Sequence, residues 1–208
     1  MGRGHGSSRG GGGASGAGRD GRSAGLTKAL EAAEASMRSQ IAENSYIFDE
    51  QGNEVYRSGR ESNQQMSSNP KLNALMNRTY NTHRQTSLDA SKVPNNIITH
   101  NHPSNGSFST DDLHAALDHN AKEIRAVGPT RTYSLRRGKN GWGVDGRTVG
   151  MEYGRIKAEM GKADARYVAR YKGDKKAAQR RVDATRAHRI MKQVSKQFGL
   201  DYTYSRAQ

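Results

Sequence analysis

The segment from residue 95 to residue 117 constrains the fold of this chain more than any other. It opens with a short apolar run, Asn95-Asn-Ile-Ile-Thr-His100, of the length and composition that fill one buried strand. The pair Asn105-Gly106 then indicates a turn. Ser109 is a favoured helix N-cap residue, and the helix after it has an apolar face made of Leu113, Ala116 and Leu117. The sequence therefore predicts a strand, a turn and a helix in direct succession.

The rest of the core is predicted to alternate helices with short strands. A helix is expected over Leu26–Glu43, where apolar residues recur at helical spacing. Two strands, Ser45–Asp49 and Glu54–Ser58, flank a turn signal and predict a hairpin. The remaining expected elements are a helix over about Pro70–His83, strands at Glu123–Val127 and Arg131–Arg136, and Trp142 as a closing core residue. This order favours a mixed α/β (α+β) fold.

Composition divides the chain into three parts. Residues 1–25 consist mainly of Gly, Ser and Arg without an apolar anchor, and we expect them to form a disordered tail. Residues 26–149 contain the predicted core. Residues 150–208 are rich in Ala, Lys and Arg, and their apolar positions predict a basic extension of two helices that bend near Lys172-Gly173. The extension is expected to dock on the core through a thin apolar stripe.

The formal net charge of +14 is concentrated before residue 25 and after residue 130. A basic surface attracts polyanions, so contact with nucleic acid or another polyanion through the two termini is one interpretation. The alternative is a solvated face that keeps the protein soluble or docks on an acidic partner. No stretch approaches the roughly 20 apolar residues that span a bilayer. We therefore expect no membrane partner, and a cytoplasmic protein, or a virion-associated one if a phage encodes it. The oligomeric state is left open.

The chain has no cysteine, which excludes disulfides, thiolate nucleophiles and zinc sites built on sulfur. A metal would have to be held by histidines and carboxylates. His100 and His102 are one residue apart at the end of the predicted strand, so both imidazoles can reach one ion. Asp112 would lie close by, on the first turn of the following helix. Two histidines, a carboxylate and a water describe an open catalytic Zn²⁺ site, in which zinc lowers the pKa of its water and polarises a carbonyl.

A simpler interpretation exists for each piece of this pattern. Ser109-Thr-Asp-Asp112 is a good helix start in its own right, because the serine caps and the acidic residues favour the positive end of the helix. The two histidines by themselves also fit a surface turn with exposed imidazoles. Their combination in the order strand, turn and helix favours the metal site. His114 and His119 are expected to be surface or packing residues, not ligands.

The run His100-Asn-His-Pro followed by Ser109-Thr-Asp-Asp112 resembles the signature of the JAB/JAMM (MPN) zinc metalloprotease superfamily. It is most similar to the RadC-like branch and to JAB domains of bacteriophage proteins, over about Ile41 to Val149. The resemblance implies a deaminase-like core with a small mixed sheet flanked by helices, a catalytic zinc, and hydrolysis of peptide or isopeptide bonds in a protein substrate. By position, His100, His102 and Asp112 match the zinc ligands, and Ser109 matches the serine that steadies the tetrahedral intermediate.

The family also uses a glutamate that precedes an earlier strand as general base. Glu43 is the best match, and Glu50, Glu54 and Glu61 are alternatives. The chain departs from the family in one respect, because the interval from His102 to Ser109 is one residue shorter than usual. Three functions follow: a metallopeptidase or isopeptidase, a phage- or toxin-associated module, and a structural or nucleic-acid-binding protein whose metal site is degenerate.

Overall fold

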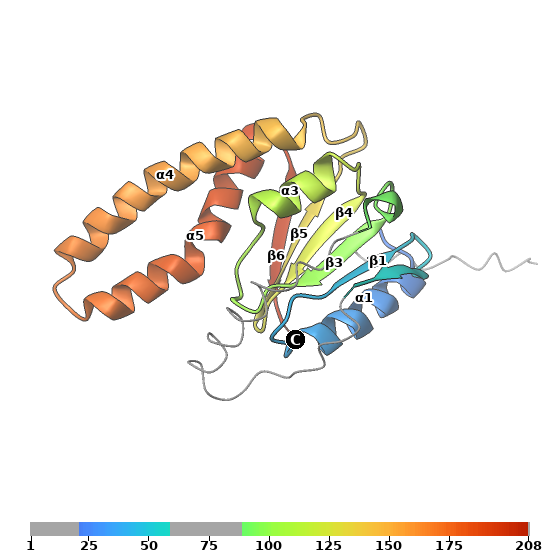
Figure 1. Cartoon of the computed structure of the whole chain (residues 1–208), viewed down its shortest axis with the longest axis horizontal. Helices are drawn as coiled ribbons and strands as arrows, with labels where there is room; N and C mark the ends of the chain where they lie inside the picture. The colour runs from blue at the N-terminus through green and yellow to red at the C-terminus, as the bar shows by residue number, and fades with distance from the viewer. Residues whose placement is uncertain (1–20, 59–88, 208) are drawn as a thin grey trace, which may run out of the picture.

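The structure is a computed structural model and describes residues 21–58 and 89–207. This part of the chain contains six strands and four α-helices (Figure 1). The strands are β1 (Ser45–Phe48), β2 (Glu54–Arg57), β3 (Ile97–Asn101), β4 (Glu123–Val127), β5 (Arg131–Arg136) and β6 (Asp201–Arg206). The helices are α1 (Ala24–Met37), α3 (Thr110–Leu117), α4 (Gly146–Arg170) and α5 (Lys175–Phe198), with a short 3-10 turn at Ala90–Lys92. The expected helix over Pro70–His83, most of the expected tail and Glu61 lie outside the described residues.

The strands form one mixed sheet in the order β2-β1-β3-β4-β5-β6. β3 and β4 are parallel, and the other neighbouring pairs are antiparallel. Every residue of β3 is buried, because this strand is central and covered on both faces. The register places Ser45 of β1 opposite His100 of β3. The loop that leads into β1 therefore runs beside the end of β3.

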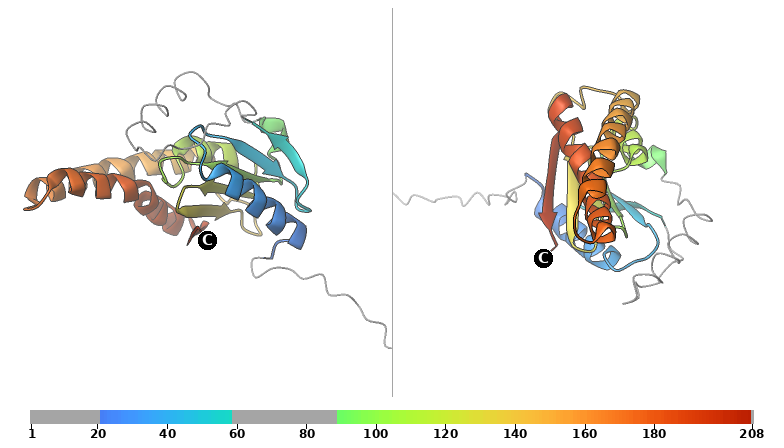
Figure 2. Two further views of the ribbon diagram at one scale, coloured as in Figure 1. Left: turned by 90° about the horizontal axis from the view of Figure 1, so that it is seen from below. Right: turned by 90° about the vertical axis from the view of Figure 1, so that its left-hand side faces the viewer.

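Helices cover the two faces of the sheet unequally (Figure 2). Helix α1 packs on one face, where Leu30 and Met37 meet Tyr46, Phe48 and Ile97. Helices α3, α4 and α5 cover the other face in a larger cluster, which includes Trp142 as expected. Side chains alternate between the two faces along each strand, as a pleated backbone requires. Ile98 and Ile124 consequently join the larger cluster.

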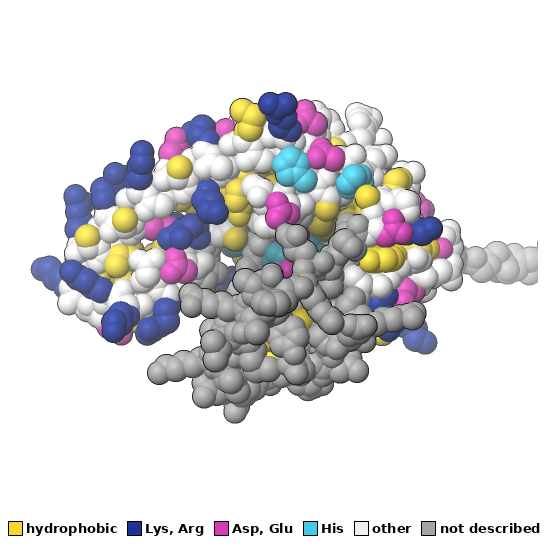
Figure 3. Space-filling view, in the orientation of Figure 1, with side chains coloured by type: hydrophobic (Ala, Val, Ile, Leu, Met, Phe, Trp, Pro, Cys, Tyr) yellow, Lys and Arg dark blue, Asp and Glu magenta, His cyan; other side chains and the backbone are white. Residues whose placement is uncertain are grey.

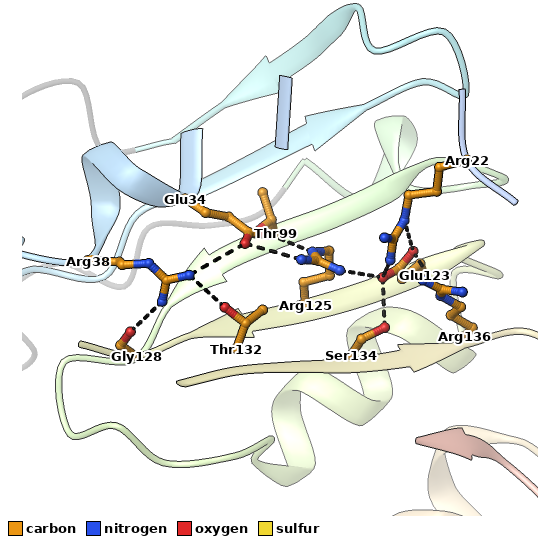
Figure 4. Close-up of polar contacts among 10 residues, drawn as sticks. All are labelled: Arg22, Glu34, Arg38, Thr99, Glu123, Arg125, Gly128, Thr132, Ser134 and Arg136. Atoms are coloured by element: carbon orange, nitrogen blue, oxygen red, sulfur yellow. Dashed lines mark hydrogen bonds and ion pairs between the residues drawn. The ribbon is translucent and has the colours of Figure 1, made fainter. Parts of the chain in front are cut away.

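The same alternation points polar side chains of β4 and β5 toward α1 and builds a buried ionic network (Figure 4). Arg125 donates from Nε to Glu34 of α1 at 2.5 Å and from Nη1 to Glu123 at 3.0 Å. Ser134 and Arg22 also donate to Glu123. Burial raises the pKa of Glu123, but the charges of Arg125 and Arg22 outweigh it and hold the pKa below its ordinary value. The network therefore ties α1 to the sheet through charged groups with little exposure to water.

The expected helix over Leu26–Glu43 is too long, because α1 ends at Met37. Ile41 is still buried, but it is placed by a loop that runs along β3. Asn101 explains the difference: its side-chain amide donates to the carbonyls of Gln40 and Ala42, and its oxygen accepts from the backbone N–H of Asn44. These contacts hold residues 40–44 in a bent, non-helical path. Side-chain bonds from a distant strand thus overrule a local helical pattern.

The strand predictions agree closely with the structure. The hairpin of β1 and β2 is confirmed, with each strand one residue shorter than expected, and β4 and β5 have the expected bounds. β3 begins two residues later than expected, at Ile97. β6 was not expected; its six residues pair with β5, and five of them are exposed.

The basic extension begins earlier than expected, since α4 starts at Gly146 behind the N-cap Asp145. As expected, α4 and α5 are separate helices with a break around residues 171–174. They form a hairpin that extends past the sheet (Figure 1). Asp164 of α4 joins the two helices by accepting from Arg186 and Arg189 of α5. Among the described residues, none of the helices combines the length and apolar character needed to cross a bilayer.

Candidate metal centre

The end of β3 delivers two imidazoles to one point. His100 is the fourth residue of β3 and is 3% exposed. His102 follows the strand, and its backbone N–H continues the pairing by donating to Val127 at 2.8 Å. The Nδ1 of His102 lies 3.1 Å from the carbonyl oxygen of Gly106. An N–H at Nδ1 that donates to this carbonyl leaves the lone pair on Nε2, which is the form that binds a metal.

Asp112 meets the imidazoles from the first turn of α3. Its Oδ1 lies 3.0 Å from Nε2 of His100, and its Oδ2 lies 3.4 Å from Nε2 of His102. Oδ2 also accepts from the backbone N–H and the hydroxyl of Ser109, at 2.6 and 2.8 Å, while Ser109 caps the helix. The helix-cap interpretation and the ligand interpretation therefore describe the same carboxylate. The capping box fixes the rotamer that faces the histidines.

Glu43 approaches the same point from the loop before β1. Its Oε1 lies 3.8 Å from Nε2 of both His100 and His102, and its side chain is 43% exposed. Glu50 and Glu54 instead pair with Lys122 and Arg57. Within residues 21–58 and 89–207, Glu43 is thus the glutamate beside the imidazoles. The donor atoms of Glu43, His100, His102 and Asp112 all lie within 4.8 Å of one another, so the cluster could hold a metal ion.

The spacing of these donors fits a small divalent ion. Zinc bonds of about 2.0–2.1 Å in a tetrahedral arrangement separate ligand atoms by roughly 3.3 Å. The Nε2 atoms of His100 and His102 are 2.9 Å apart, and the contacts of Asp112 with them are 3.0 and 3.4 Å. Two imidazoles and one carboxylate are also a ligand set that zinc accepts. Glu43 lies farther out, where a proton acceptor would be needed instead of a ligand.

The electrostatics of the cluster favour a positive charge at its centre. Burial lowers the pKa of His102, but the hydrogen bond and charge of Asp112, with the charge of Glu43, raise it to about 9. Burial raises the pKa of Asp112, but the two imidazoles hold it well below its ordinary value. Either a proton or a metal ion can supply the positive charge that this arrangement stabilises.

The shorter interval between His102 and Ser109 is accommodated by a tight turn. Asn105 adopts a left-handed backbone with φ of 59°, and its N–H donates to the carbonyl of His102 at 2.8 Å. The sequence predicted a turn at Asn105-Gly106, and it is Asn105 that takes the left-handed backbone, where its side-chain amide donates to the hydroxyl of Thr130 at 2.8 Å. Gly128 leaves the necessary space, because a side chain there would clash with Asn105. Asp112 still reaches both histidines despite the shorter loop.

A cleft of about 600 Å³ opens beside the cluster. The loop of residues 102–109 and Glu43 form one side of it, and α4 and α5 form the other. Its lining includes Glu43, His102, Pro103, Phe108, Ser109, Tyr153, Arg180, Asp183 and Ala187. Ser109 therefore lies at the cleft, although its hydroxyl donates to Asp112. His114 lies outside the cluster, with its Nδ1 2.7 Å from Asp118.

Two tyrosines that sequence analysis missed hold the loop in place. The hydroxyl of Tyr153 on α4 donates to the carbonyl of Phe108 at 3.0 Å. Burial and the charge of Asp112 raise the pKa of Tyr153 to about 12, so this donor stays protonated. The hydroxyl of Tyr202 on β6 lies 2.8 Å from both Ser107 Oγ and His188 Nδ1. In the sequence, the only signal at Tyr153 is its helical spacing, which predicts burial but no role at the site. No local pattern connects Tyr202 with the site.

Comparison with known proteins does not assign the chain to a family. The chain matches no protein-family model, no curated protein and no solved structure. The resemblance to the JAB/JAMM superfamily thus stays a prediction based on the residues of the site.

Proposed function

We propose that this chain is a zinc-dependent hydrolase of the JAB/JAMM type that cleaves peptide or isopeptide bonds in a protein substrate. The convergence of Glu43, His100, His102 and Asp112 beside an open cleft carries the proposal. The arrangement around it supports the same conclusion: a mixed sheet, two histidines at the end of a central strand, and a carboxylate on the next helix. The JAB/MPN fold is part of the proposal.

Three side chains would hold the ion, and one would move the proton. His100 and His102 bind through Nε2, and Asp112 binds through its carboxylate. A bound zinc ion supplies a Lewis acid for the substrate carbonyl and lowers the pKa of water at the site. Oε1 of Glu43, 3.8 Å from both Nε2 atoms, accepts a proton from the attacking water and returns it to the leaving amine.

The surrounding residues orient the reacting groups. Tyr153 and Ser109 fix the loop and the Asp112 carboxylate through the hydrogen bonds described above. Phe108 and Ala187 provide apolar surface in the cleft, and Arg180 and Asp183 of α5 provide charges at its far side. A cleft with both kinds of surface suits a segment of polypeptide with mixed side chains. Ser109, at the cleft, has a hydroxyl that can turn toward a substrate oxygen as the tetrahedral intermediate forms.

The test is hydrolysis by the full chain of a panel of fluorogenic peptides and of isopeptides formed on lysine side chains. We expect cleavage of at least one class with zinc, its loss after chelation, and its return with about one equivalent of added zinc. The variant His102→Ala should stay inactive at the same zinc concentration, because it lacks one ligand. Cleavage that survives complete removal of metal would contradict the proposal.

A further inference from the structure

The far end of the α4–α5 hairpin carries an unusual density of positive charge. We define the basic arm as residues 157–181, which comprise the distal halves of α4 and α5 and the turn between them. It contains nine Lys or Arg residues and three Asp or Glu residues. All nine basic side chains are exposed. On the face seen in Figure 3, Lys and Arg side chains gather along the end of the hairpin.

The acidic residues of the basic arm are already engaged within the fold. Asp164 is 5% exposed and accepts from Arg186 and Arg189, which lie outside the arm. Asp174 caps α5 by accepting from the backbone N–H groups of residues 176 and 177. Glu159 pairs with Arg155, nearer the sheet. Asp174 also lies 3.8 Å from Arg180 of the arm, in an exposed pair. Apart from that contact, these carboxylates do little to neutralise the outward-facing cations.

The charge pattern of α4 changes where the helix enters the arm. Nearer the sheet, Arg155 pairs with Glu152 and Glu159 at the usual helical spacings. Farther out, Lys162, Arg166 and Arg170 follow one another at intervals of four residues. In the described part of the chain, none of these three side chains lies within 4.0 Å of a carboxylate. Like charges four residues apart repel each other and destabilise a helix. An external anion would remove that penalty.

The spacing and the shape favour nucleic acid over other anions. Residues four apart rise about 6 Å along a helix, close to the distance that one DNA strand advances along the duplex axis over two phosphates, at about 3.4 Å each. A membrane-surface helix needs a broad apolar face. The large apolar side chains exposed on the arm are two tyrosines, Tyr167 and Tyr171, whose ring centroids are 5.7 Å apart. Exposed aromatic rings among cations suit stacking on bases.

We propose that the basic arm binds the phosphate backbone of nucleic acid. The stripe Lys162–Arg166–Arg170 contacts one run of phosphates, and the first turn of α5, with Lys175 and Lys176, adds further contacts. Helix α5 also contributes Arg180 to the cleft of the candidate metal centre. Binding along the arm would thus hold that cleft beside the nucleic acid. This inference depends on charge and geometry of the arm alone and is independent of the proposed hydrolase activity.

The test is fluorescence anisotropy of labelled duplex and single-stranded oligonucleotides titrated with the full chain at several salt concentrations. The variant Lys162→Gln/Arg166→Gln/Arg170→Gln is compared with a matched control, Lys28→Gln/Lys139→Gln/Arg147→Gln, which removes the same charge from exposed positions outside the arm. We expect the arm variant to weaken binding about tenfold or more at low salt and to reduce the salt slope by about 2 to 3. The control should change the affinity less than about twofold. This difference between the two variants would show that binding depends on the arm and not on the net charge of the chain.

A second variant separates binding from folding. Lys175→Glu/Lys176→Glu puts negative charge on the first turn of α5, where the helix dipole favours it. We therefore expect an unchanged or higher melting temperature together with loss of binding. Equal weakening by the arm and control variants would overturn the proposal, as would absence of oligonucleotide binding. Arm-dependent binding to phosphatidylserine vesicles without binding to oligonucleotides would also overturn it.

Discussion

We expect Glu43→Gln to lower the rate of the proposed hydrolysis by about 10²–10⁴-fold and to leave the zinc content unchanged. The size of the effect follows from the position of this carboxylate. Its Oε1 is 3.8 Å from both imidazole Nε2 atoms, whereas these atoms and Asp112 are 2.9 to 3.4 Å apart. In the proposed mechanism, Glu43 is therefore the proton acceptor beside the three ligands. An amide at this position keeps the shape of the side chain but cannot accept the proton.

The measurement compares initial rates and bound zinc for the wild type and Glu43→Gln. Glu50→Gln and Glu54→Gln serve as matched controls, because these glutamates pair with Lys122 and Arg57 away from the site. Both controls should keep most of the wild-type activity. A fully active Glu43→Gln variant would show that another group accepts the proton. Loss of zinc in that variant would instead make Glu43 a ligand.

Replacing Arg125 by Met destabilises the fold by about 3–5 kcal/mol. Arg125 contacts Glu34 and Glu123 at the same time, and the side chains of all three are at most 13% exposed. Removing the guanidinium leaves Glu34 with only the more distant Arg38, 3.9 Å away, while Glu123 keeps Arg22 and Arg136. Glu34 then lacks a close cation in a region with little water. The loss of a partner from a buried ion pair is costly for this reason, whereas the complete pair adds little to stability.

Chemical denaturation monitored by circular dichroism measures this effect. The exposed pair between Arg57 and Glu54 offers a control, because Arg57→Met should cost no more than about 1 kcal/mol. Adding Glu34→Gln to Arg125→Met should recover part of the stability, since the carboxylate that has lost its closest cation is then removed. A cost below about 1 kcal/mol for Arg125→Met would show that the network is better solvated than its burial indicates.

Acid should weaken the same network. The pKa of Glu123 is held below its ordinary value of 4.5 in the folded chain, so the folded state binds the proton less readily than the unfolded state. The stability that Glu123 contributes is therefore fully present above pH 4.5 and is lost as the pH falls through the lowered pKa of the folded state.

Local sequence patterns were sufficient to predict those parts of the fold that depend on local chemistry. The hairpin of β1 and β2, the strands β4 and β5, and the N-cap at Ser109 follow from alternation, turn residues and capping preferences. β6 was missed because its alternation consists of only two tyrosines, Tyr202 and Tyr204, in a short exposed edge strand. The length of α1 was misjudged because the helix is followed by a loop that hydrogen bonds from Asn101 hold in place. Asn101 lies about 60 residues farther along the chain, so no local pattern predicts these bonds.

The candidate site divides in the same way. His100 and His102 could be brought together from their spacing on one strand, and Asp112 from its place on the next helix. The resemblance then led to Glu43, and the antiparallel register of β1 with β3 places Glu43 beside the two histidines. Tyr153 and Tyr202 could not be found from the sequence, because their partners lie 45 and 95 residues away. Such contacts depend on tertiary packing that no local motif records.

The most direct test of the account is the zinc content of the purified chain after equilibration with zinc and removal of the unbound metal. We predict about one zinc per chain for the wild type and for His114→Ala/His119→Ala, which removes two histidines outside the cluster. His100→Ala/His102→Ala should retain almost none. A wild-type chain without zinc, or a His100→Ala/His102→Ala variant that holds as much as the wild type, would contradict the claim that these residues form one metal centre.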